Sequence, residues 1–162
     1  MPVHILLATD ADWIVEDVTS ALGGPDTSFT VCRDGRAVSG VVRERRPDLV
    51  IADLQVGSMG GMAISLALRN DESLGTEPGV PILMLLDRQA DVYLAQRSLA
   101  DSWLIKPLDA LRLKRAALAA IAGEGIQEGV PAVPADDVEM PDDAEVDSET
   151  ETSPEEEPAT AG

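Results

Sequence analysis

Five short apolar runs, separated by segments with helical spacing, predict an alternating order of strands and helices up to about residue 123. The predicted strands cover residues 3–8, 29–32, 49–54, 81–86 and 102–105. Three of the runs, at 5–8, 49–52 and 82–86, are continuously apolar rather than alternating. Continuous runs of this length are typical of strands that are covered on both faces, as in a parallel sheet.

The segments between the strands predict five helices. Asp12 is the expected N-cap of the first, which ends at Gly23 and places Ile14, Val18, Ala21 and Leu22 on one face. The others cover 35–46, 61–69, 89–100 and a last helix that is capped by Asp109, runs to residue 123 and carries Leu111, Leu118 and Ala122 on one face. Alternating units of this kind predict an α/β fold with a doubly wound, five-stranded parallel sheet and right-handed crossovers.

Composition changes abruptly after Gly123 and divides the chain into a domain at 1–123 and a tail at 124–162. All 12 basic residues lie at or before Arg115, whereas 14 of the 30 acidic residues lie in the tail. The tail therefore carries −14 of the net charge of −18, and the domain carries only −4. The tail lacks a periodic apolar face, which predicts disorder. It is interpreted as a solubilising extension. The alternatives are that it competes for a basic surface of a partner or folds back onto Arg112, Lys114 and Arg115.

The cysteine content and the first residues of the chain indicate the cellular compartment in which the protein is expected. Cys32 is the only cysteine, so an intrachain disulfide is impossible, and its place in an apolar run predicts a buried thiol. The first residues lack the basic and long apolar regions of a signal peptide. The apolar runs are far shorter than the roughly 18 residues of a membrane span. We therefore expect a cytoplasmic protein without a membrane segment.

Charged residues follow the predicted strands where parallel strands share one edge of the sheet. Asp10 comes after the first strand, Asp53 closes the third, Asp87 follows the fourth and Lys106 follows the fifth. Ligands of doubly wound sheets bind at this edge. Two carboxylates about 4 Å apart repel each other by roughly 4 kcal/mol at an effective dielectric of 20. Asp10 and Asp53 therefore favour a cation between them, and Mg²⁺ suits a site with few carboxylates and several waters.

Lys106 adds a positive group that could hold an oxygen of a transferred phosphoryl group. A carboxylate beside a metal ion and a lysine is suited to act as a nucleophile toward phosphorus. The edge of the sheet thus predicts phosphoryl chemistry on Asp53.

The segments 5–10, 47–54, 59–61 and 105–107, taken in order at the ends of predicted strands, resemble those of the CheY-like response-regulator receiver family. The resemblance covers residues 3–122 and implies a sheet with strand order 2-1-3-4-5. It implies that Asp53 is the phosphoacceptor, with Lys106 as the phosphate partner. It also implies that Mg²⁺ is bound by Asp10, Asp53 and the backbone carbonyl of Gln55. The function that follows is that of a single-domain response regulator rather than an enzyme.

Four positions depart from the family pattern. Thr9 stands where receivers usually carry the first of two acidic residues, and Leu86 replaces the switch Thr or Ser after strand four. Asp87 occupies a position that is usually small, and Trp103 takes the place of the switch aromatic residue. Loss of one acid is expected to weaken Mg²⁺ binding. Loss of the hydroxyl removes a hydrogen bond to the phosphoryl group, which is worth about 1.5–3 kcal/mol.

The resemblance also implies the partners. A histidine kinase or phosphotransfer protein is expected upstream, and a target protein is expected to dock on the face formed by helix 4, strand 5 and helix 5. The alternative to a docking surface is a charged face that is simply solvated. Five basic residues fall on this face: Arg88, Arg97, Arg112, Lys114 and Arg115. They lack interleaved aromatic residues, so direct DNA binding is not expected.

Three other functions compete with this reading. A pseudo-receiver of the same fold would act through its surface without phosphate. A phosphatase of the haloacid-dehalogenase type would use Asp10-Ala11-Asp12 as its nucleophile motif, but the order of the lysine and the later acids in this chain does not fit that family. A flavin-binding flavodoxin is disfavoured because no phosphate-cradling loop follows the first strand.

Overall fold

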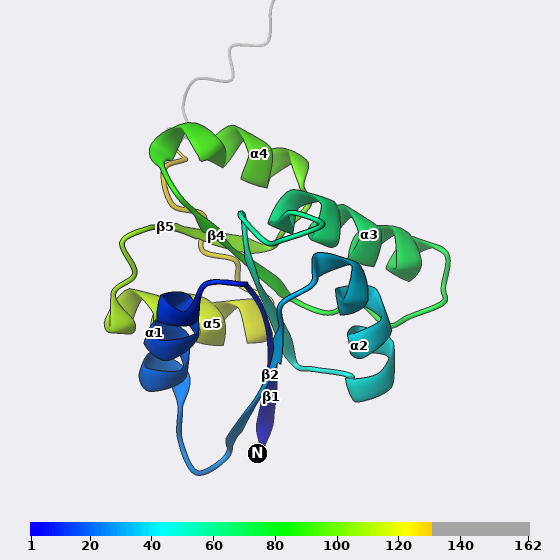
Figure 1. Ribbon diagram of the computed structural model, residues 1–162, viewed down its shortest axis with the longest axis horizontal. Helices are drawn as coiled ribbons and strands as arrows, with labels where there is room; N and C mark the ends of the chain where they lie inside the picture. Colours follow the sequence, from blue (N-terminus) through cyan, green and yellow to red (C-terminus); the bar gives the residue numbers. More distant parts are fainter. Residues whose placement is uncertain (131–162) are drawn as a thin grey trace, which may run out of the picture. The chain divides into compact units, whose positions relative to one another are not determined.

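The structure, a computed structural model, describes residues 1–130, and the predicted disorder of the tail beyond residue 130 lies outside them. Its centre is a five-stranded sheet of parallel strands with the order β2-β1-β3-β4-β5 (Figure 1). The strands are β1 (Val3–Ala8), β2 (Thr27–Cys32), β3 (Leu49–Asp53), β4 (Ile82–Leu86) and β5 (Ser102–Ile105). The order reverses between β1 and β3, which confirms the predicted doubly wound sheet.

Helices cover both faces of the sheet. Helices α1 (Asp12–Leu22) and α5 (Ala110–Ile121) pack together on one face. On the other face lie α2 (Val38–Arg45), α3 (Gly61–Ser73) and α4 (Val92–Arg97), and single 3-10 turns precede α2 and α4 at Gly35–Ala37 and Gln89–Asp91 (Figure 1). None of the helices among residues 1–130 is both long and apolar enough to cross a bilayer.

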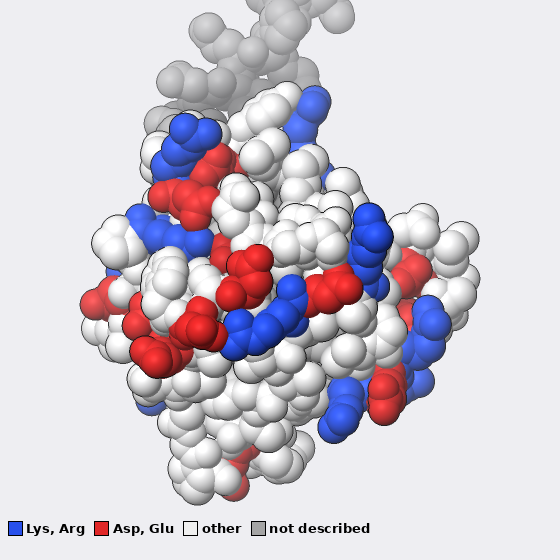
Figure 2. Space-filling model, in the orientation of Figure 1, with Lys and Arg blue, Asp and Glu red and all other residues white. Residues whose placement is uncertain are grey.

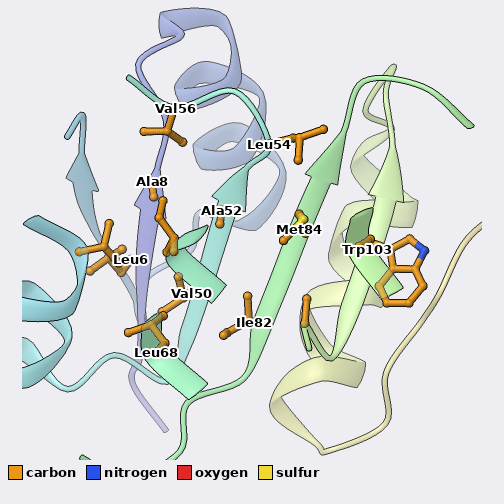
Figure 3. Close-up of a cluster of buried hydrophobic side chains, with 14 of the residues drawn as sticks. Leu6, Ala8, Val50, Ala52, Leu54, Val56, Leu68, Ile82, Met84 and Trp103 are labelled. Carbon is orange, nitrogen blue, oxygen red and sulfur yellow. The ribbon is translucent and has the colours of Figure 1, made fainter. Parts of the chain in front are cut away.

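The continuous apolar strands are explained by two separate cores. Alternate residues of a strand point to opposite faces of a sheet. Leu6, Val50 and Met84 accordingly belong to the core beneath α2, α3 and α4, together with Trp103 at the β5 end of that cluster (Figure 3). Their neighbours, among them Leu7, Ile51 and Leu85, belong to the core beneath α1 and α5. Both faces of the central strands are therefore buried, as the apolar runs predicted.

The predicted element boundaries hold to within a few residues. Strands β1 and β5 match, whereas β2 begins two residues earlier and α3 ends four residues later than expected. Ala11 rather than Asp12 is the N-cap of α1, and Asp12 is its first acidic residue. Asp109 does cap α5, since its carboxylate accepts a hydrogen bond from the Arg112 amide.

The predicted apolar face of α5 is wrong. Leu111 and Leu118 are 68% and 59% exposed. The buried face consists instead of Leu113, Ala116, Ala117 and Ala120. Both sets have helical spacing, so periodicity alone could not separate them. Three alanines let α5 lie close to the sheet, and the bulkier leucines are left on the outside.

The compact domain extends past residue 123, where the predicted boundary lay. Residues 124–130 run along the outer edge of β5 and are called the edge strap below (yellow to orange in Figure 1). Trp103 donates its backbone amide to the Ile126 carbonyl at 2.9 Å, and Glu128 forms an ion pair with Arg112. The alternative that the acidic segment folds back onto Arg112 is thus confirmed for these residues.

Acidification is expected to loosen the edge strap. Burial alone raises the pKa of Glu128, but hydrogen bonds from Arg112 and the Ile105 amide outweigh it and hold the pKa below its ordinary value of 4.5. The stability that Glu128 contributes is therefore complete above about pH 4.5 and is lost as the pH falls through the lowered pKa. As the pH is lowered from about 4.5, the strap should detach from Trp103 and expose its indole to water. In a Trp13→Phe background, the emission of Trp103 should therefore shift to longer wavelength.

The matched controls for this titration are Glu128→Gln and Glu124→Gln, which each remove one carboxylate from the strap. The shift should be absent in the first variant and retained in the second. A shift that is identical in both would show that another group is responsible.

Candidate functional site

The candidate site lies at the carboxyl edge of the sheet, where β3 and β5 flank β4. Asp53 is the last residue of β3, and Lys106 directly follows β5. Helix α3 begins very close to this point, since a Cβ at Gly61 would lie 2.5 Å from the carbonyl oxygen of Asp53. Only a glycine fits there, which explains why the sequence Gly60-Gly61 opens α3.

Asp53 and Lys106 form an ion pair. The Lys106 ammonium donates to Oδ1 of Asp53 at 2.7 Å, and the two side chains are only 12% and 2% exposed. The hydroxyl of Thr9 donates to Oδ2 of Asp53 at 3.0 Å, and the Gln55 amide donates to Oδ1 at 3.3 Å. The pairing of Asp53 with Lys106, on which the phosphoryl hypothesis depends, is therefore present. The contact made by Thr9 is one that sequence reasoning missed, because that residue was treated only as a lost acid.

Asp87 points into the same site. Its Oδ1 accepts from the Lys106 ammonium at 2.7 Å, so one lysine bridges two carboxylates. Burial alone lowers the pKa of Lys106, but the hydrogen bonds to Asp53 and Asp87 outweigh it and raise the pKa above its ordinary value. Lys106 therefore stays charged throughout the physiological range.

Trp13, in the first turn of α1, borders the site. Its ring centroid lies 5.6 Å from the Lys106 nitrogen, which is within the range of a cation–π contact. The side chain is 50% exposed. No signal in the sequence distinguishes this role, because the contact joins the first turn of α1 to the loop after β5.

Asp10 follows β1 at the same edge of the sheet as Asp53, and its contacts are made to other residues. Its Oδ2 accepts from the Gly57 amide at 3.1 Å, and its carbonyl accepts from Arg33. Arg33 also pairs with Asp12, whose side chain is 83% exposed. Asp12 is thus turned toward Arg33 and solvent, which argues against the two-aspartate motif of a haloacid-dehalogenase phosphatase.

The donors at this edge fit a Mg²⁺ ion that keeps most of its water. Among the described residues, no group of three or more His, Cys, Asp or Glu side chains converges as a ready-made metal cage. Mg²⁺ is commonly held by one or two carboxylates together with waters and phosphate oxygens. Asp10, Asp53 and the Gln55 carbonyl are oxygen donors of the kind that Mg²⁺ binds. Because Thr9 stands where the family pattern has an acidic residue, this edge carries one carboxylate fewer than that pattern.

The two predicted switch positions are both buried. Leu86 is fully buried at the end of β4, where its side chain offers no hydrogen bond to a ligand. Trp103 is 1% exposed, and its indole donates to the Glu128 carbonyl of the edge strap at 2.9 Å. The structure therefore places Trp103 against the strap rather than beside Asp53.

Charges of both signs are mixed on the face shown in Figure 2, where acidic and basic groups lie next to one another. Several of the basic residues near α4 and α5 have local partners. Arg88 pairs with Asp91, Arg112 pairs with Glu128, and Arg97 lies over the Tyr93 ring at 4.8 Å. The face around α4, β5 and α5 is thus partly neutralised by neighbouring groups.

Comparisons with known proteins agree with this arrangement. The family model of the response regulator receiver domain matches residues 5–118. The chain is 37% identical over 109 residues to the DNA-binding response regulator MtrA of Mycolicibacterium paratuberculosis, covering 66% of this chain and 46% of that protein. It is 29% identical over 141 residues to the transcriptional regulatory protein CseB of Streptomyces avermitilis, covering 86% and 57%. The chain thus spans about half the length of the curated relatives it matches.

Solved structures share the fold. A putative response regulator from Chloroflexus aurantiacus superposes with a TM-score of 0.68 at 21% identity and covers 75% of this chain and 99% of that one. The chemotaxis response regulator CheY4 of Vibrio cholerae has a TM-score of 0.64 at 22% identity, with 74% and 99% covered. The match over residues 5–118, together with the five-stranded sheet, shows that the chain belongs to the response regulator receiver domain family of two-component signalling.

Proposed function

We propose that the protein accepts a phosphoryl group on Asp53 from a histidine kinase or phosphotransfer protein and signals by docking a target protein. The observation that carries this proposal is the 2.7 Å contact between the Lys106 ammonium and Asp53. Receiver domains in general are signalling modules that interact with such phosphodonors rather than enzymes. In the proposed step a carboxylate oxygen of Asp53 bonds to phosphorus as the bond to the donor nitrogen breaks.

Each neighbour of Asp53 has a distinct part in that step. Lys106 neutralises the carboxylate before transfer and is placed to donate to a phosphoryl oxygen afterwards. Asp10, Asp53 and the Gln55 carbonyl would hold Mg²⁺, which would offset the negative charge of the phosphoryl group. The Thr9 hydroxyl keeps the Asp53 side chain in one orientation through its bond to Oδ2.

Two residues work against efficient switching. Asp87 occupies Lys106 at 2.7 Å and brings a second negative charge to the place where phosphoryl oxygens would collect. Leu86 supplies no hydroxyl to hold the phosphorylated conformation. These features favour the second candidate function, a pseudo-receiver whose surface binds its partner without phosphate. They also predict that phosphorylation of Asp53, where it occurs, is inefficient.

Phosphotransfer separates the two candidates. The wild-type protein is incubated with acetyl phosphate and Mg²⁺, and labelling is followed by intact mass. We expect a modified fraction that disappears in Asp53→Ala and persists in Asp34→Ala, an aspartate of the loop after β2. Equally low labelling of the wild type and Asp53→Ala would eliminate the phosphoacceptor and leave the pseudo-receiver.

A further inference from the structure

The edge strap occupies the open side of β5 as an added strand would. Trp103 donates its backbone amide to the Ile126 carbonyl at 2.9 Å, and the Glu128 amide donates back to the Trp103 carbonyl at 3.3 Å. Gln127 thereby forms a parallel bridge with Trp103. The edge of a sheet presents unpaired amides and carbonyls that can pair with another extended segment. Here residues 124–130 of the same chain use them.

A binding site for a carboxylate, formed by the Ile105 amide and the Arg112 guanidinium, lies at the end of this edge. Oε2 of Glu128 accepts from the Ile105 amide at 2.9 Å, and Oε1 accepts from Nε of Arg112 at 2.8 Å. The guanidinium of Arg112 also donates to the carbonyls of Pro107 and Ile105 at 3.0 and 3.1 Å. These backbone contacts hold the guanidinium in place. The carboxylate-binding site is therefore formed by residues of β5 and α5 and does not depend on the strap.

Apolar and close-packed positions complete the fit. Ile126 packs against the core beneath α1 and α5, whereas Val130 packs against the core on the other face of the sheet. A Cβ at Gly125 would lie 2.0 Å from the Asp101 carbonyl, so glycine is needed for the strap to lie this close. In addition, the Ser102 hydroxyl accepts from the Ile126 amide at 2.9 Å. The strap therefore fits the edge through backbone pairing, one carboxylate and two flanking apolar side chains.

We propose that the β5 edge, with Arg112 at its end, is a docking site for an extended acidic segment of a partner protein, and that the edge strap fills it in cis. Addition of a strand to a sheet edge derives affinity from main-chain bonds and specificity from side-chain pockets. The partner segment carries a Glu or Asp that takes the place of Glu128. Because the strap is tethered, its effective concentration is on the order of millimolar, and a partner binds only in competition with it.

The test uses the full chain and a fluorescent peptide with the sequence of residues 124–130, Glu-Gly-Ile-Gln-Glu-Gly-Val. Glu128→Gln weakens the strap, and Glu124→Gln is the matched control, since Glu124 is exposed whereas Glu128 pairs with Arg112. We expect the peptide to bind Glu128→Gln at least about tenfold more tightly than either the wild type or Glu124→Gln, a difference of 1.4 kcal/mol. A peptide with Gln at its fifth position should lose this advantage.

Hydrogen exchange provides the second readout and does not depend on the peptide's label. The amides of Trp103 and Ile105 should exchange faster in Glu128→Gln than in Glu124→Gln, and added peptide should restore their protection. Circular dichroism establishes that both variants are folded. Equal peptide affinity in all three proteins, or no binding to any of them, overturns the proposal. Neither readout requires phosphorylation of Asp53, so the proposed function and this docking site can fail independently.

Discussion

Replacing Lys106 with Met is expected to lower the free energy of unfolding by about 3 kcal/mol, because removing one partner of a buried ion pair leaves an uncompensated charge. In this protein two carboxylates lose their counterion at once, since Asp53 and Asp87 each lie 2.7 Å from the Lys106 ammonium. Asp53 is 2% exposed and has little access to water. Urea denaturation at pH 7 measures the loss.

The controls make this prediction specific to the pair. Lys114→Met removes the only other lysine, which is exposed on α5, and should change stability by less than about 0.5 kcal/mol. Asp53→Asn should cost less than Lys106→Met, because Lys106 keeps Asp87 as a partner. Combining Asp53→Asn with Lys106→Met should recover part of the loss. If Lys106→Met were as stable as Lys114→Met, the ion pair would contribute nothing to folding.

Asp87→Asn is expected to raise the affinity for beryllofluoride, a phosphoryl mimic, by about tenfold in the presence of Mg²⁺. The substitution removes a negative charge that shares Lys106 with Asp53, and like charges 4–6 Å apart repel by a few kcal/mol at an effective dielectric of 20. Asp87 is 37% exposed, so water screens part of this effect, and a tenfold change corresponds to only 1.4 kcal/mol. The emission of Trp13, which lies against Lys106, reports binding.

Asp26→Asn is the matched control for this measurement. Asp26 is an exposed aspartate just before β2, at the amino end of the strands, so its removal changes the net charge equally but far from Asp53. Its affinity should equal that of the wild type. Tighter binding by both variants would indicate a general effect of net charge, and unchanged binding by Asp87→Asn would remove Asp87 as the cause of inefficient phosphorylation.

The local pattern of apolar residues was sufficient to predict the order of strands and helices. The continuous apolar runs at 5–8, 49–52 and 82–86 predicted central strands, and each is buried on both faces. The same logic brought Asp53 and Lys106 together, since residues that follow parallel strands must meet at one edge of the sheet. The apolar pattern failed on α5, because Leu111 and Leu118 have the same seven-residue spacing as Leu113 and Ala120 of the true buried face.

The amino-acid sequence by itself thus determined the strand and helix order, the sheet edge that carries the chemistry, and the pairing of Asp53 with Lys106. Only the tertiary structure decided which way the remaining side chains point. In the structure Asp87 accepts a hydrogen bond from Lys106, the Trp13 ring lies beside the same ammonium, and Glu128 forms an ion pair with Arg112. The physical reason is that periodicity records burial, which is repeated along an element. A contact between two side chains that are far apart in the sequence occurs only once. It depends on the geometry of the fold and leaves no repeating pattern in the chain.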